Sequence, residues 1–268
     1  MFNKFFRLFN RLSPYFGYPL IGPLLKRVVD LEPEAKTQGY TLSLNADLSN
    51  LAQGVALPID MMKQAVHQSE YRAIVNECLC RSSYDCKRYP HDHGCLFLGG
   101  GARAVVKQRM GHEASVEEAL AHIDKGAELG LIGQALWIEV ERLLLGIKRE
   151  KNVAHWLEMC FCCPCCCGTS KLNRATNQQD IKRRFRSIGW KATVNEALCV
   201  QCGLCTKQCP IEVISCENGH LTIDEQACLG CGLCAMHCPN EAIALQLRTP
   251  LLGTIQDYFT SGGLKVEI

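Results

Sequence analysis

The sequence has 268 residues, of which 47% are apolar and 21% charged, with a formal net charge of +2. This composition describes a globular chain of one large or two modest domains and excludes one too polar to bury a core. Its 19 cysteines are odd in number and clustered, with no secretory leader before them, which argues against a disulfide framework and for thiolates that bind metal. We therefore expect a cytoplasmic protein that works where oxygen is scarce.

Residues 1–40 form a basic segment with amphipathic character. Before its first acid, Asp30, it contains Lys4, Arg7, Arg11, Lys26 and Arg27. Its apolar runs are too short for a membrane-spanning helix of about 20 residues. Phe2, Phe5, Phe6 and Phe9 can share one helical face, so peripheral contact with a membrane or a partner is one interpretation. We favour the other, a helix packed on its own domain.

Residues 41–170 show the periodicity of an α-rich domain. Pro58 begins a predicted helix that continues through Ala73 to the first cysteine. Ser115 and Glu118 form a capping box at the start of a second helix, which Gly130 ends. A third apolar segment covers residues 134–147.

Four cysteines lie between the first two predicted helices, at Cys78, Cys80, Cys86 and Cys95. Thiols so close together, beside turn-forming Pro90 and Gly94, predict a loop around a metal centre. The spacing lacks the paired C-x-x-C knuckles of most zinc sites, so we favour an iron–sulfur centre. His91, Asp92 and His93 could bind the metal too, but we favour solvated loop residues. The triple glycine at 99–101 lacks the lysine of a phosphate loop and predicts a turn with close backbone approach.

The stretch CFCCPCCCG adds six more candidate ligands, Cys160, Cys162, Cys163, Cys165, Cys166 and Cys167. Buried thiols without metal are disfavoured, because so many close sulfurs would oxidise. Pro164 is expected to fix a bend between the two cysteine groups. With the four earlier cysteines they predict one or more further iron–sulfur clusters in this domain.

Residues 171–191 are a predicted basic linker. From 171 to 194 there are seven basic residues and one acid, whereas residues 195–247 contain six acids and a single lysine. The linker is therefore expected to lie along its acidic neighbour. No DNA-binding fold is recognisable, so we expect no nucleic-acid partner.

The C-terminal part contains an internal repeat. CVQCGLCTKQCPIEVI, beginning at Cys199, recurs 29 positions later as CLGCGLCAMHCPNEAI. Each half reads C-x2-C-x2-C-x3-C-P, in which three cysteines hold one iron–sulfur cube and the fourth reaches to the other cube. The predicted ligand sets are Cys199, Cys202, Cys205 and Cys238 for one cluster, and Cys228, Cys231, Cys234 and Cys209 for the other.

Other residues of the repeat have structural interpretations. Gly203 and Gly232 are expected to let the backbone approach the clusters. Asn218 and Gly219 predict the turn of a hairpin. Cys216 is interpreted as a spare core thiol.

Residues 192–247 closely resemble the bacterial two-cluster 4Fe-4S ferredoxins. The resemblance implies two short hairpins, two short helices, two 4Fe-4S clusters and transfer of single electrons at low potential. The earlier part is similar, more loosely, to bacterial 4Fe-4S binding proteins of unassigned role, through Cys78, Cys80 and Arg81 and the later cysteine-rich stretch. Its adjacent cysteines also resemble the CCG-containing subunits of heterodisulfide reductases, although only one CCG occurs and the long spacings differ.

The expected fold is α+β, with an α-rich cysteine-containing domain, a small two-cluster ferredoxin-like domain and a C-terminal tail at 248–268. The expected function is electron transfer to a partner oxidoreductase, as a carrier or oxidoreductase subunit rather than a stand-alone enzyme. In the alternative, the N-terminal cluster is catalytic and reduces a disulfide-like acceptor. No other catalytic motif is present in the sequence.

Overall fold

The computed structural model describes residues 8, 11, 12, 15, 18–28, 37–45, 58–148, 150–175, 184–217 and 220–268. The phenylalanines of the predicted amphipathic face lie outside these residues, and the basic segment contributes the short helix α2 (Gly22–Val28). Among the described residues, no helix is long and apolar enough to span a bilayer.

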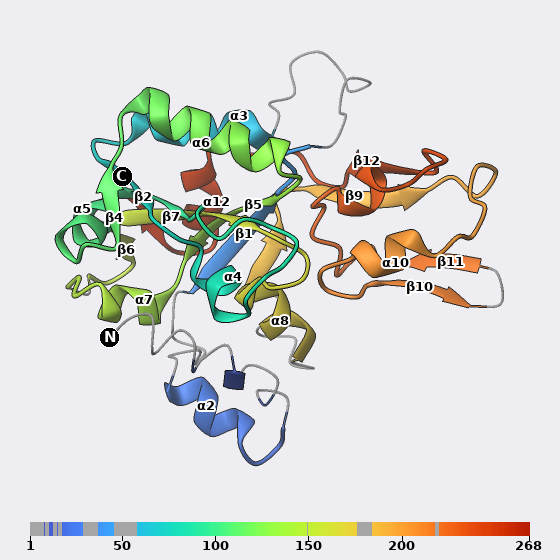
Figure 1. Ribbon diagram of the computed structural model, residues 1–268, viewed down its shortest axis with the longest axis horizontal. Helices are drawn as coiled ribbons and strands as arrows, with labels where there is room; N and C mark the ends of the chain where they lie inside the picture. The colour runs from blue at the N-terminus through green and yellow to red at the C-terminus, as the bar shows by residue number, and fades with distance from the viewer. Residues whose placement is uncertain are drawn as a thin grey trace.

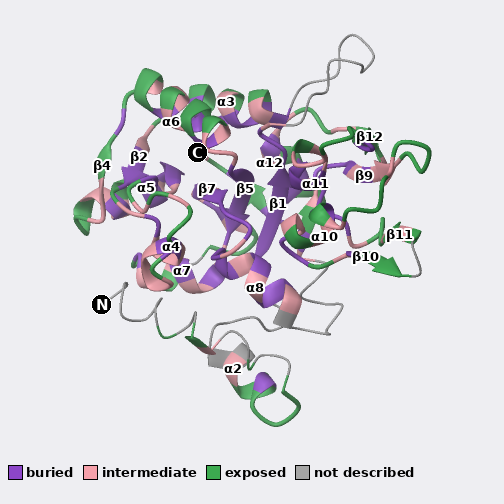
Figure 2. Ribbon diagram, turned by 45° about the vertical axis from the view of Figure 1, so that its right-hand side comes forward, coloured by how far each residue is buried: buried purple, intermediate pink, exposed green. Residues whose placement is uncertain are grey.

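A seven-stranded sheet lies at the centre of the molecule, where the sequence patterns predicted mainly helices. Its strand order is β4-β2-β3-β7-β5-β1-β8, and only the β1–β8 pair is parallel. The strands are β1 (Gln38–Leu42), β2 (Arg72–Val75), β3 (Leu96–Gly99), β4 (Gly111–Glu113), β5 (Ile132–Trp137), β7 (Trp156–Cys162) and β8 (Phe185–Ser187). Figure 2 shows β1, β5 and β7 as the buried core.

Two sequence predictions change because of this sheet. The helix α3 (Pro58–Gln68) ends before Ala73, which pairs with Phe97 in β3 instead. The apolar segment 134–147 divides between β5 and the helix α7 (Glu139–Leu144). Strands β2 and β5 are almost wholly buried, so they lack the alternation of polar and apolar residues that identifies a half-exposed strand.

The second predicted helix is confirmed as α6 (Val116–Glu128). Ser115 and Glu118 form the reciprocal hydrogen bonds of a capping box, and Gly130 follows with a left-handed φ of 68°. Figure 1 shows α3 and α6 side by side above the sheet. The remaining helices of this part are α4 (Leu79–Ser83), α5 (Gly100–Lys107) and α8 (Gly168–Ala175).

The triple glycine is a close-approach turn, as predicted. Gly99 has a φ of 72°, and the Gly100 amide donates to the carbonyl of His155 over 2.7 Å. A Cβ on Gly101 would lie 2.8 Å from the Cβ of Trp156. The position therefore has no room for a side chain.

The C-terminal repeat forms the compact unit on the right of Figure 1. The hairpin of β10 (Ile214–Glu217) and β11 (His220–Ile223) is confirmed, although its two turn residues are outside the described residues. The second strand pair joins β9 (Trp190–Val194) to β12 (Ile243–Leu247), the first and last strands of the unit, rather than two consecutive ones. The helices are α10 (Leu204–Gln208) and α11 (Leu233–Met236). Cys216 is exposed on the hairpin, so its interpretation as a core thiol was wrong.

The residues after this unit return to the central sheet. Helix α12 (Ile255–Ser261) buries Phe259 completely, and β13 (Lys265–Val266) pairs with β6 (Val153–Ala154). The Tyr40 hydroxyl donates to the carbonyl of Tyr258 over 2.6 Å. Residues 248–268 thus pack against the N-terminal part of the chain.

Described parts of the predicted basic linker contact the acidic unit, as expected, but residues 171–175 belong to helix α8 and residues 185–187 to strand β8 of the central sheet, so these parts are not a free linker. Arg174 lies 3.3 Å from the carboxylate of Glu212, and Lys191 forms an ion pair with Glu225.

Candidate metal centres

Two cavities in the C-terminal unit are each lined by four cysteines. The first ferredoxin quartet, which lines one cavity, is Cys199, Cys202, Cys205 and Cys238. The second ferredoxin quartet, which lines the other, is Cys209, Cys228, Cys231 and Cys234. In each cavity three cysteines come from one half of the repeat and the fourth comes from the other half.

The backbone around the two cavities has the same features in both halves of the repeat and places amide groups near the cysteine sulfurs. Gly203 and Gly232 precede α10 and α11 with φ of 70° and 82°, a conformation that favours glycine. The amide of Val213 donates to Cys209 Sγ over 3.4 Å, and that of Ala242 to Cys238 Sγ over 3.3 Å. Such N–H···S bonds stabilise thiolates that bind a metal or cluster.

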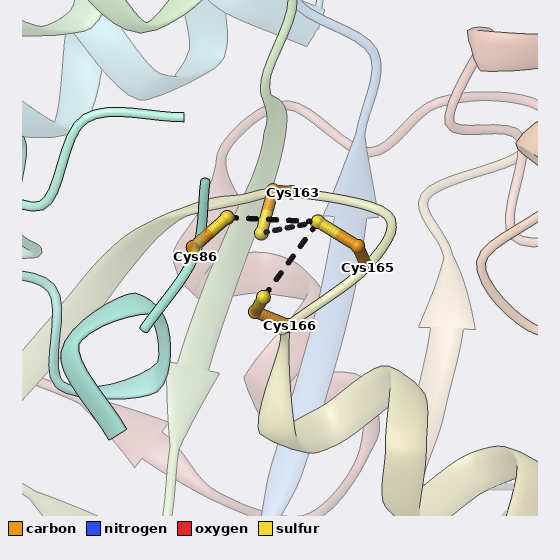
Figure 3. Close-up of side chains that lie close together, drawn as sticks. All are labelled: Cys86, Cys163, Cys165 and Cys166. Atoms are coloured by element: carbon orange, nitrogen blue, oxygen red, sulfur yellow. Dashed lines mark hydrogen bonds between the residues drawn. The ribbon is translucent and has the colours of Figure 1, made fainter. Parts of the chain in front are cut away.

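The ten cysteines before the linker divide into two sets. The four-thiol group is Cys86, Cys163, Cys165 and Cys166, whose sulfurs all lie within 4.8 Å of one another. Its members come from the loop after α4 and from the turn after β7, and they point toward a common centre in Figure 3. The Sγ of Cys165 is 3.7 Å from that of Cys86 and 3.6 Å from those of Cys163 and Cys166.

The six-thiol set lines a cavity of about 90 Å³ between the sheet and the helices α4, α7 and α8. Its members are Cys78, Cys80, Cys95, Cys160, Cys162 and Cys167. Cys163 of the four-thiol group also borders this cavity. The two sets are therefore neighbours.

Two pairs within the six-thiol set favour deprotonation of one member. Hydrogen bonding with Cys80 lowers the pKa of Cys78 to about 7, and hydrogen bonding with Cys162, whose Sγ is 3.1 Å away, lowers that of Cys167 to about 6. Hydrogen bonding to the partner and burial raise the pKa of Cys80. Since the thiolate is the metal-binding form, each such pair presents a ready ligand.

Two buried carboxyl groups that were not predicted from the sequence border the same cavity. Glu158 Oε1 accepts from Cys160 Sγ over 3.0 Å, and Glu158 forms a close group with Cys95 and Cys160. Burial, with the adjacent Glu158, raises the pKa of Glu141. In the sequence, Glu158 stands out as the one acid in the apolar run WLEMCFC, which indicates a buried carboxyl group.

Arg81 joins the two cysteine-bearing segments. It is fully buried and donates to the carbonyls of Pro90 and Phe161 over 2.7 Å each, and to that of His93. Its charge also lies close to several thiols, including those of Cys78 and Cys163. A buried cation beside thiolates lowers the cost of their negative charge.

His93 is a core residue and not a solvated one, contrary to the expectation from sequence. Its ring stacks on that of His122 with centroids 3.9 Å apart, and its edge meets Phe161. Burial, with the neighbouring His122, lowers the pKa of His93 to about 3. His93 therefore stays neutral and packs the cysteine loop against α6.

The six-thiol set contacts the second ferredoxin quartet. Cys162, Cys167 and Leu233 are buried in one apolar cluster, with Cys231 packed against it. Leu233 and Cys231 belong to the C-terminal unit, so two cysteine-lined cavities adjoin through this cluster.

Comparison with known proteins identifies the C-terminal unit. A family model described as a 4Fe-4S dicluster domain matches residues 192–245, whereas no curated protein matches the chain. With its cysteine-lined cavities, this part of the chain is an iron–sulfur, ferredoxin-like domain. Iron–sulfur electron transfer is the activity that such a domain indicates.

Proposed function

We propose that the chain passes single electrons through two 4Fe-4S clusters of its C-terminal domain and a further iron–sulfur centre of its N-terminal part. The first and second ferredoxin quartets are the proposed ligand sets of the two clusters, which carry one electron at a time when bound. The six-thiol set is the proposed ligand source for the N-terminal centre. The chain would act as a carrier or as a subunit of an oxidoreductase.

The apolar cluster around Leu233 is the observation that supports this function most strongly. It brings Cys231 of the second ferredoxin quartet against Cys162 and Cys167 of the N-terminal cavity. Electron transfer needs redox centres in close succession, and a dry, packed contact also keeps solvent from the buried thiolates. An independent ferredoxin domain would not need to bury its own cysteine against a second cysteine-lined cavity.

The first ferredoxin quartet is the proposed entry point for a redox partner. Cys202 is exposed, and Val200 beside it is 62% exposed. Leu198 and Leu204 are also exposed near this cavity. An apolar surface beside an accessible cluster suits the brief, small contacts typical of electron-transfer partners. The proposed path runs from this surface to the second quartet and then to the N-terminal cavity.

The order of the path is tested by disabling the first quartet. In Cys199→Ser, the ferredoxin signal of the first cluster should disappear. The N-terminal centre should then be reduced more slowly by a protein donor, while a small chemical reductant still reduces it. Freeze-quench paramagnetic resonance measures the rate at which each reductant reduces the N-terminal centre. Cys216→Ser on the exposed hairpin is the matched control. Equal rates of reduction by the protein donor in both variants would contradict the proposed path.

A catalytic N-terminal centre is the second candidate function, and the 90 Å³ cavity is the observation that favours it. The cavity has apolar walls, from residues such as Leu136 and Ile138, beside the carboxyl groups of Glu141 and Glu158. A small acceptor could bind there and receive a proton from Glu141, because burial raises the pKa of this carboxyl group and favours its protonated form. A change in the resonance spectrum of the N-terminal centre on adding a small disulfide would favour this function over simple transfer.

A further inference from the structure

We infer that the four-thiol group, Cys86, Cys163, Cys165 and Cys166, binds a single zinc ion rather than an iron–sulfur cluster. The ten N-terminal cysteines would then serve two purposes, with four holding zinc and six left for the iron–sulfur centre. This inference concerns different ligands from the electron path and stands independently of it.

The distances between the sulfurs fit one ion in a tetrahedral site. Zinc–sulfur bonds of about 2.3 Å place the four sulfurs of a tetrahedron about 3.8 Å apart. Cys165 Sγ lies 3.6 Å from two of the other sulfurs and 3.7 Å from the third, and all four are within 4.8 Å of one another. The thiols thus have the spacing of ligands that share one metal ion.

An iron–sulfur cube requires a wider arrangement, because each of its four thiolates binds a different iron. The ferredoxin quartets of the same chain provide the comparison. Every one of their eight cysteines is described, and none belongs to a group of three or more ligand atoms within 4.8 Å. Nor do any four members of the six-thiol set, all of them described, come this close together. Among the described residues, the four-thiol group is thus the one set of four thiols with this compact spacing; the other compact group, Cys95, Glu158 and Cys160, has two thiols and a carboxylate.

The backbone around the four-thiol group supports a closed metal site. Amides of Arg88 and Tyr89 donate to Cys86 Sγ, and the amide of Cys166 donates to Cys163 Sγ. Pro164 begins the turn that brings Cys163 and the next two cysteines to one centre. Short turns with N–H···S bonds are what zinc-binding cysteines need to hold their charge.

The chemistry of the ligand set favours zinc over other ions. Four thiolates leave no open position, as in structural zinc sites. Soft sulfur ligands in a tetrahedron select zinc or iron, and among divalent ions zinc binds such ligands more tightly than iron. The sequence does not reveal the site, because Cys86 and Cys165 are 79 positions apart and the four cysteines include one C-x-x-C pair, Cys163 and Cys166, instead of the two pairs of most structural zinc sites.

A zinc ion at this point would fix the wall of the N-terminal cavity. Cys86 is in the loop that continues to Cys95, and Cys163 directly follows β7, which carries Cys160 and Cys162. The ion would join this loop to the end of β7, from which members of the six-thiol set extend. Its proposed role is therefore structural, and it supports the neighbouring iron–sulfur site.

Metal analysis of the full chain, purified without oxygen, tests the inference. We expect about one zinc per chain in addition to iron and sulfide. Cys165→Ser should lose the zinc, whereas Cys216→Ser should keep both metals. Cys78→Ser, in the six-thiol set, should lose the iron of the N-terminal centre and retain both the ferredoxin iron and the zinc. Zinc that persists in Cys165→Ser, or a wild-type chain with iron and no zinc, would overturn the inference.

A second measurement does not depend on how a variant folds. Cobalt(II) introduced during growth should replace the zinc of the wild-type chain and give the intense sulfur-to-cobalt absorption of a tetrahedral thiolate site. Cobalt with only oxygen or nitrogen ligands, or no cobalt bound, would count against the site. In either case the iron and sulfide content reports separately on the electron-transfer proposal.

Discussion

Replacing Arg81 by methionine should uncouple the two cysteine-bearing segments. The buried guanidinium donates to three carbonyls, those of Pro90, His93 and Phe161. Methionine has a similar volume and donates no hydrogen bond, so these carbonyls would lose their partner in a dry interior. Each loss costs about 1 kcal/mol or more, and breaking a buried charged network costs about 3–5 kcal/mol.

That loss corresponds to a fall of roughly 10 °C in the unfolding midpoint of a chain of this size. The N-terminal metal should also be lost, because the loop and β7 would separate, while the signals of the ferredoxin quartets survive. The assays are anaerobic thermal unfolding and metal counting. Arg103→Met is the control, since Arg103 is exposed and only stacks on Tyr71 at 4.3 Å, a contact worth about 0.5–1 kcal/mol. If Arg81→Met kept its N-terminal metal and its midpoint, Arg81 would have no part in assembling the site.

Two further predictions concern cysteines and a third concerns Leu233. Cys209→Ala should remove the cluster of the second ferredoxin quartet and leave the first comparatively intact, as resolved by paramagnetic resonance; selective loss of the first cluster would reverse the assignment. Burial raises the pKa of Cys163 and of Cys231 to about 12, so protons compete with metal ions for these sulfurs. The metal affinity of the metal-free chain, measured by titration against a chelator, should therefore increase as the pH rises. An affinity that does not change with pH would show that these thiols are already ionised. Leu233→Ala should slow electron transfer between the second quartet and the N-terminal centre without changing the iron content, and an unchanged rate would remove this contact from the path.

The sequence predicted local features and the repeat, but not how distant segments come together. The capping box at Ser115 and the turn at Gly99 depend on neighbouring residues, so their patterns were sufficient. The ferredoxin-like domain was recognisable because its ligand spacing repeats. The central sheet was missed because strands such as Arg72–Val75 are short and buried on both faces, and such runs look like continuations of adjacent helices.

The arrangement of the N-terminal cysteines was likewise not predictable from local sequence patterns. Their number predicted metal binding, but their division into four and six depends on pairing across the sheet. Strand β3, which follows Cys95, pairs with β7 in the register Leu96 to Met159, and this brings Cys95 beside Cys160. The buried acid Glu158 became meaningful only once that pairing was known. Long-range register of this kind has no local signal in a single sequence.

Iron and acid-labile sulfide, counted per chain in the anaerobically purified protein, test the central claim most directly. Two ferredoxin quartets account for about eight irons and as many sulfides. The proposed N-terminal centre, held by the six-thiol set, requires a count clearly above that, and Cys78→Ser should return it to about eight. A wild-type chain with about eight irons or fewer, unchanged by Cys78→Ser, would contradict the extension of the electron path into the N-terminal cavity.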